Sequence, residues 1–198
     1  MRRYEEYTIQ FDEIPARRTK WNVIYEMLDS LSLAVLLVMV LFAFVCRPFW
    51  VSGASMEPTL LDRNWVAVTT LGFHAQRGDI VVISQPNALN EPLIKRIIAV
   101  AGDTVEIDPQ AHTVAVNGEN LDEPYISEPV EKAGDLTYPV QVPEGYVFVM
   151  GDNRNDSLDS RSSTIGFIDT RYLSGKAVFR LLPAGQWQIG ENLSLIHI

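Results

Sequence analysis

Apolar residues are distributed along this chain in two different ways. Residues 31–46 (LSLAVLLVMVLFAFVC) form one run without a charge. Apolar and aromatic flanks extend this run to residues 21–48, and a transmembrane helix needs about 20 apolar residues. A helix in the core of a soluble protein is the alternative, but few such helices are apolar on every side. The pattern therefore predicts one membrane-spanning segment.

The residues around this run predict whether it is cleaved and how it is oriented in the membrane. The residues before Cys46 (AFV) lack the small side chains of a signal-peptide cleavage site, so we expect an uncleaved signal anchor. Basic residues precede the run, which favours a cytoplasmic N-terminus; they are Arg2, Arg3, Arg17, Arg18 and Lys20. We therefore expect residues 1–20 to be a cytoplasmic tail, 21–48 the anchor and 49–192 an extracytoplasmic domain.

Beyond residue 60, the apolar pattern changes to short runs between turn residues. No long segment with helical periodicity follows the anchor, and Asn117–Gly118 is a hairpin signal. The pattern predicts a mainly β fold, with antiparallel sheets arranged in a barrel-like domain. Residues 122–143, rich in Pro and Glu, are expected to have little regular structure. The strand-like runs are residues 65–71, 79–84, 93–100, 104–107, 113–116, 146–150 and 175–182.

Composition narrows the range of partners and of folds. Of the 198 residues, 47% are hydrophobic, which is typical of a folded protein, and the net charge is −9. Nucleic acid is not an expected partner, because its binding needs a basic face. The single cysteine, Cys46, cannot form a disulfide within the chain. Residues 193–198 (LSLIHI) resemble a translated sequencing adaptor, so we expect the natural chain to differ after about Asn192.

The candidate chemistry rests on a serine and a lysine rather than on histidine or metal. His74, His112 and His197 belong to no motif, and the chain has no cluster of metal-ligand residues, so we expect no metal and no cofactor. A lysine removed from water can act as a base, and Lys95 lies in the apolar run LIKRIIAV. Its spacing equally fits a lysine that protects an edge strand from aggregation.

A polar segment, GDNRNDSLDSR at residues 151–161, directly follows the strand-like run 146–150. Asp, Asn and Ser favour turns, and the two arginines of this segment can pair with its carboxylates. A solvated loop would explain the composition as well. Loops that a rigid scaffold holds are, however, where site residues concentrate.

These features together resemble the bacterial type I signal peptidases, which are membrane-anchored serine proteases that remove signal peptides from exported proteins. The resemblance rests on four stretches in the family's order: SGASMEPTL (52–60), RGDIVV (77–82), IKRIIAVAGDTV (94–105) and GDNRNDSLDSR (151–161).

The resemblance implies a role for each matching residue. Ser55 matches the nucleophile, Lys95 the general base, and Ser157 a serine that orients the lysine amine. The residues that match the polar groups bracing the site are Arg96, Asp152, Asp159 and Arg161. Met56 and Pro58 match the segment beside the nucleophile. Gly53 stands where some members have a serine that helps to bind the oxyanion, which leaves the second oxyanion donor open.

The resemblance also implies preprotein substrates cut after an Ala-x-Ala-like site, and membrane lipid as a second partner. An acyltransferase with a Ser-x-x-Lys motif is disfavoured, because Pro58 occupies the lysine position of that motif. A self-cleaving repressor is disfavoured by the membrane segment. An inactive or non-enzymatic membrane-anchored β domain stays as the alternative interpretation.

Overall fold

A computed structural model describes residues 20–42, 46–86, 91–183 and 189. The chain divides into two units, residues 1–39 and 40–198, and each is described by itself. Within the first unit, helix α1 (Lys20–Val40) has no buried residue and is long and apolar enough to cross a membrane. The expected tail at residues 1–20 and the expected adaptor at 193–198 lie outside the described residues, except for Lys20.

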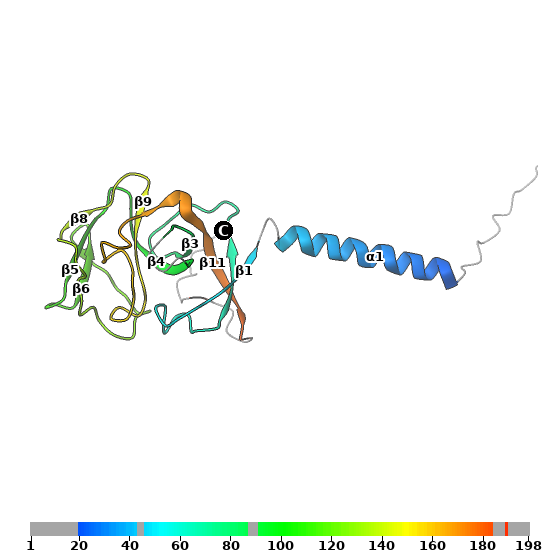
Figure 1. Ribbon diagram of the computed structural model, residues 1–198, viewed down its shortest axis with the longest axis horizontal. Helices are drawn as coiled ribbons and strands as arrows, with labels where there is room; N and C mark the ends of the chain where they lie inside the picture. The colour runs from blue at the N-terminus through cyan, green and yellow to red at the C-terminus, as the bar shows by residue number, and fades with distance from the viewer. Residues whose placement is uncertain (1–19, 43–45, 87–90, 184–188, 190–198) are drawn as a thin grey trace, which may run out of the picture. The chain divides into compact units, whose positions relative to one another are not determined.

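The second unit is built of antiparallel β-sheet (Figure 1). The larger sheet has seven strands in the order β1-β2-β11-β3-β4-β9-β10, and the smaller has four in the order β7-β6-β5-β8. The larger sheet comprises β1 (Arg47–Trp50), β2 (Trp65–Thr69), β3 (Ile80–Ile83), β4 (Leu93–Val100), β9 (Tyr146–Met150), β10 (Ile168–Asp169) and β11 (Leu173–Leu182). The smaller sheet comprises β5 (Thr104–Asp108), β6 (Thr113–Val116), β7 (Glu119–Asn120) and β8 (Val140–Gln141). A short 3-10 helix, η2 (Thr170–Tyr172), precedes β11.

The mainly β fold expected from the sequence is confirmed, and each of the seven strand-like runs contains a strand. The Asn117–Gly118 turn joins β6 to β7, with positive φ angles of 57° and 79° at its two residues. Such angles are typical of the hairpin turn that this dipeptide favours. Residues 122–139 contain no helix or strand, as expected, although β8 follows directly.

The anchor boundary differs from the sequence interpretation at its C-terminal end. Residues 47 and 48 were assigned to the anchor, but Arg47–Trp50 form strand β1, which pairs with β2 through Trp50 opposite Trp65. The backbone there is extended and hydrogen-bonded to a neighbouring strand, and Pro48 is tolerated because β1 is an edge strand. The nucleophile candidate is therefore only a few residues from an ordered sheet edge.

Two features of the large sheet position the candidate site. Strand β4 lies inside the sheet, with β3 on one side and β9 on the other. Its burial is nearly continuous from Leu93 to Ala99, because core clusters cover it. An ionisable side chain buried on such a strand must be paired with an opposite charge or must lose its own charge. Lys95 and Arg96 are the two charged residues of β4.

Candidate active site

Ser55 lies in a tight turn that follows β1. The Glu57 N–H donates to the Ala54 carbonyl at 3.0 Å, which closes the turn. Met56 is only 1% exposed and belongs to the core cluster that contains Val51. The Met56 side chain thus points into the core and fixes the turn, while Ser55 is half-buried and accessible.

Lys95 approaches Ser55 from the middle of the large sheet. Its Nζ donates to Ser55 Oγ at 2.6 Å and to the Ile94 carbonyl at 3.1 Å. The Lys95 side chain is almost completely buried, and this desolvation lowers its pKa from 10.5 to about 8. Two carboxylates, Asp159 and Asp152, oppose the shift, and Arg161 adds to it. A hydroxyl and an amine with a depressed pKa are therefore within hydrogen-bond distance.

Two bidentate ion pairs brace this arrangement. Arg96 donates to Asp152 Oδ1 at 2.8 Å and Oδ2 at 2.6 Å, and to the Gly78 carbonyl at 2.9 Å. Arg161 donates to both oxygens of Asp159 at 2.8 Å. All four side chains are buried, where an unpaired charge is strongly unfavourable. The four polar residues that the sequence singled out thus form two pairs around the loop 151–161.

Ser157 lies beside the nucleophile segment at Gly151. A Cβ added at Gly151 would lie 2.3 Å from both Ser157 Oγ and the Ser55 carbonyl oxygen, so only glycine allows the loop to pass this closely. Ser157 Oγ is buried and has no hydrogen-bond partner within the described part of the chain. The bond from Ser157 to the lysine amine that the resemblance implies is not formed here. The orphaned hydroxyl nevertheless lies next to the candidate site.

A third charged cluster was missed by the sequence analysis. Arg154 has a fully buried side chain and donates to both oxygens of Glu123, at 2.6 and 2.5 Å. The ring of Tyr125 lies 3.8 Å from the Arg96 guanidinium carbon, and the Tyr125 hydroxyl donates to Glu123 at 2.9 Å. Burial and the Glu123 carboxylate raise the pKa of Tyr125. These contacts attach the irregular segment 122–139 to the site.

Thr59 links the nucleophile turn to the same cluster. Its hydroxyl donates to Asp152 Oδ2 at 2.5 Å, and Asp152 is the partner of Arg96. Because Lys95 and Arg96 are adjacent on β4, the turn, the strand and the loop are joined by one polar network. The sequence carried a weak signal for this link, since Thr59 lies within the stretch 52–60.

The remaining candidates of that stretch face solvent. Gly53 is exposed, has a φ of 84°, and donates its N–H to Asp62 at 3.0 Å. Nothing lies within 4 Å of a Cβ added at Gly53. Pro58 is also exposed. The space beside Gly53 is thus open, and its own N–H already has an acceptor.

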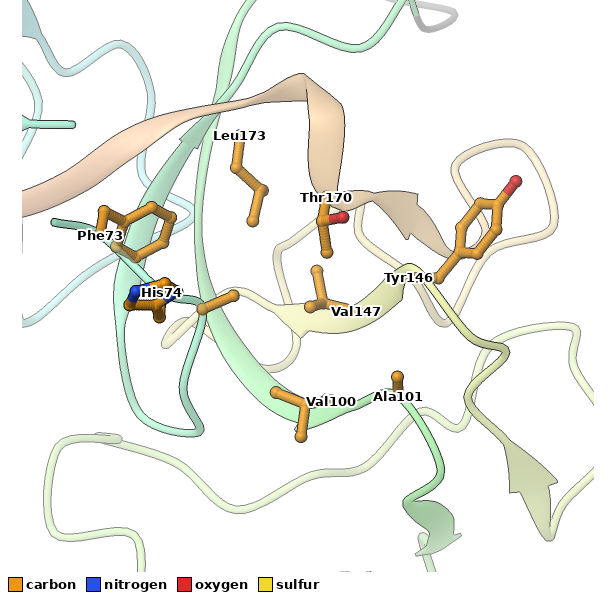
Figure 2. Close-up of a pocket in the computed structure, with 9 residues that line it drawn as sticks. Phe73, His74, Val100, Ala101, Tyr146, Val147, Thr170 and Leu173 are labelled. Atoms are coloured by element: carbon orange, nitrogen blue, oxygen red, sulfur yellow. The ribbon is translucent and has the colours of Figure 1, made fainter. Parts of the chain in front are cut away.

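A separate cavity of about 380 Å³ lies where the end of β4 meets the starts of β9 and β11. Figure 2 shows its lining, which includes Phe73, Val147 and Leu173, and shows the Tyr146 hydroxyl directed away from these side chains. Neither Ser55 nor Lys95 lines this cavity. No group of three or more His, Cys, Asp or Glu that could hold a metal occurs within the described residues.

Comparison with known proteins gives consistent matches along most of the chain. The family model described as signal peptidase, peptidase S26, matches residues 24–182. The chain is 38% identical to a signal peptidase I of Bacillus licheniformis, over 83% of this chain and 91% of that protein. It is 38% identical to a probable signal peptidase I-1 of Synechocystis, over 86% of this chain and 89% of that protein.

A third relative is a signal peptidase IB of Staphylococcus aureus, 33% identical over 84% of this chain and 94% of that protein. Among solved structures, a signal peptidase I from Enterococcus faecalis matches with a TM-score of 0.45 and 31% identity. That match covers 54% of this chain and 98% of the solved one.

Proposed function

The chain belongs to the signal peptidase I family (peptidase S26), serine endopeptidases that cleave signal peptides from preproteins, and we propose that Ser55 and Lys95 are its catalytic dyad. The observation that carries this proposal is the 2.6 Å separation of Lys95 Nζ and Ser55 Oγ at a buried lysine. A serine hydroxyl is a weak nucleophile until a neighbouring base removes its proton. A neutral lysine is such a base.

Burial makes the neutral lysine accessible near neutral pH. With a pKa of about 8, roughly a tenth of the Lys95 amines are neutral at pH 7, compared with far fewer at the ordinary value. The neutral amine accepts the Ser55 proton as the hydroxyl oxygen attacks the scissile carbonyl carbon. The resulting ammonium then gives this proton to the leaving amine, and the acyl-enzyme forms. A water that the same amine deprotonates hydrolyses the ester.

Ser157 and the Ser55 N–H have supporting roles in this scheme. An amine nitrogen bonded to Cε has three further directions, and Ser55 Oγ and the Ile94 carbonyl occupy two of them. The buried, unpartnered Ser157 hydroxyl is suited to the third, where it would orient the amine. The Ser55 N–H donates to no described residue, so it is available to the oxyanion.

Substrate and location extend the proposal. An extended signal peptide would add to an exposed strand edge, with small side chains at the first and third positions before the cut. Helix α1 is consistent with a membrane anchor. A cytoplasmic N-terminus and an extracytoplasmic peptidase domain follow from the basic residues that precede the helix. Ser55 follows the helix closely in sequence, which suits a substrate that emerges from the bilayer.

Processing of a preprotein by the full chain in detergent tests the dyad. We expect Ser55→Ala, Lys95→Ala and Lys95→Arg to abolish cleavage, because a guanidinium stays protonated and cannot serve as a base. Retention of processing by any of the three variants would refute the assignment.

Matched controls separate chemistry from folding. Ser163→Ala removes an exposed hydroxyl that donates to Asp135, and Lys176→Ala removes the partly exposed partner of Asp79. Ser163→Ala deletes a hydroxyl, as Ser55→Ala does, and Lys176→Ala deletes an amine, as Lys95→Ala does. Neither control residue is hydrogen-bonded to Ser55 or Lys95 among the described residues. We expect both control variants to process the preprotein at close to the wild-type rate.

A further inference from the structure

Asn153 contacts both peptide groups that flank Ser55. Its side-chain Nδ2 donates to the Ala54 carbonyl at 3.2 Å, and its backbone N–H donates to the Ser55 carbonyl at 3.1 Å. The loop that carries Asn153 is pressed against this segment, since a Cβ at Gly151 would lie 2.3 Å from the Ser55 oxygen. Asn153 therefore holds the nucleophile peptide from one side.

The direction of the Ser55 N–H follows from the planarity of the peptide group. In a trans peptide, the carbonyl of residue 54 and the N–H of residue 55 point in opposite directions. The cis peptide bonds of the described chain lie elsewhere. With the Ala54 carbonyl fixed on the Asn153 side, the Ser55 N–H points away from Asn153. No described residue accepts a hydrogen bond from it.

We propose that Asn153 is a positioning residue that aims the Ser55 N–H at the developing oxyanion by holding the Ala54 carbonyl. This inference rests on the proposed role of Ser55 as nucleophile. It concerns the oxyanion and not the base, because no hydrogen bond joins Asn153 to Lys95 among the described residues. Asn153 thus acts on the transition state through the Ala54–Ser55 peptide.

The size of the effect is limited by a second bond to the same carbonyl. The Glu57 N–H also donates to the Ala54 oxygen, at 3.0 Å, so removing the Asn153 amide loosens the peptide without freeing it. One hydrogen bond of this kind corresponds to roughly a tenfold change in rate. We therefore expect Asn153→Ala to lower kcat about tenfold while KM changes less than about twofold, since the lost interaction matters only in the transition state.

The test compares two inhibitors of the full chain in detergent micelles. One is a peptide ending in alaninal, and the other is the same peptide ending in the corresponding alcohol. Ser55 Oγ bonds to the aldehyde carbon, the carbonyl π pair moves to the oxygen, and the hydroxyl proton passes to Lys95. The alcohol forms no such adduct. The ratio of the two inhibition constants therefore reports oxyanion binding and does not depend on the fraction of folded protein.

We expect Asn153→Ala and the equal-sized Asn153→Asp to weaken the aldehyde about tenfold and the alcohol less than about twofold. The matched control is Asn155→Ala in the same loop. Asn155 bonds to residues of the segment 128–132 and not to the Ser55 turn. The ratio of the two inhibition constants for Asn155→Ala should therefore equal that of the wild type.

A ratio that is unchanged in both Asn153 variants, or that changes equally in Asn155→Ala, overturns the inference. Adduct formation by Ser55→Ala would overturn the proposed dyad instead. The two failures are therefore distinguishable.

Discussion

Replacing Lys95 by methionine should stabilise the protein while it abolishes activity. Burial lowers the pKa of Lys95 from 10.5 to about 8, and each unit corresponds to 1.36 kcal/mol, so keeping the lysine protonated at pH 7 costs about 3 kcal/mol. Methionine has a similar length and carries no charge. Two hydrogen bonds of the amine are lost, each worth about 1 kcal/mol net. We expect Lys95→Met to gain about 1 kcal/mol at pH 7.

The sign of the pH dependence makes this prediction sharp. Between pH 8 and 10.5, the unfolded chain holds the Lys95 proton and the folded chain does not, so wild-type stability rises with pH through this window. The free energy of unfolding of Lys95→Met relative to wild type should therefore fall by about 2 kcal/mol from pH 7 to pH 10, so that the gain of about 1 kcal/mol becomes a loss of about 1 kcal/mol. Urea unfolding in detergent micelles, followed by tryptophan fluorescence at both pH values, measures the difference. A difference that stays constant with pH would refute the reasoning.

Two further variants test the surroundings of the dyad. Ser157→Ala should lower kcat/KM on a peptide substrate by about tenfold, because a buried hydroxyl beside the site is lost; an unchanged rate would count against its role. Tyr125→Leu, which removes the ring under the Arg96 guanidinium, should lower kcat by several-fold. Tyr125→Phe keeps the ring and should stay close to wild type, and equal losses in both variants would contradict this.

The strands of the second unit could be predicted because their signal is local. Runs such as residues 93–100 and 146–150 are apolar, β-branched and bounded by turn residues, and they form β4 and β9. Strand β1 was missed because Arg47–Trp50 follows directly on an apolar run and contains a proline. Only its pairing with β2, which lies well downstream in the sequence, defines it as a strand.

The candidate site was predictable only in part, because its contacts join segments that are distant in sequence. The apolar run around Lys95 marked it as a possible base and the resemblance matched Ser55 to the nucleophile, and the structure brings the two side chains to hydrogen-bond distance although they are distant in sequence. The contacts of Glu123 and Tyr125 were not foreseen, because a segment without regular structure carries no periodic signal. Their role depends on buried guanidinium groups that arrive from a strand and a loop elsewhere in the chain.

Asn153 shows the limit of sequence reasoning most clearly. Asparagine is a residue type that favours turns, and Asn153 does lie in one, which the Asp156 N–H closes by donating to the Asn153 carbonyl. This preference does not indicate that the side-chain amide of Asn153 reaches the Ala54 carbonyl or that its backbone N–H reaches the Ser55 carbonyl. Such contacts depend on the close approach of two loops, which the sequence does not encode locally.

The pH dependence of kcat/KM on a peptide substrate tests the central claim most directly, since it reports the pKa of the base in the free enzyme. If neutral Lys95 is the base, the rate rises with pH, reaches half of its maximum near pH 8, and levels off above. A half-maximum near pH 6.5, the ordinary pKa of a histidine, or a rate independent of pH would contradict the account.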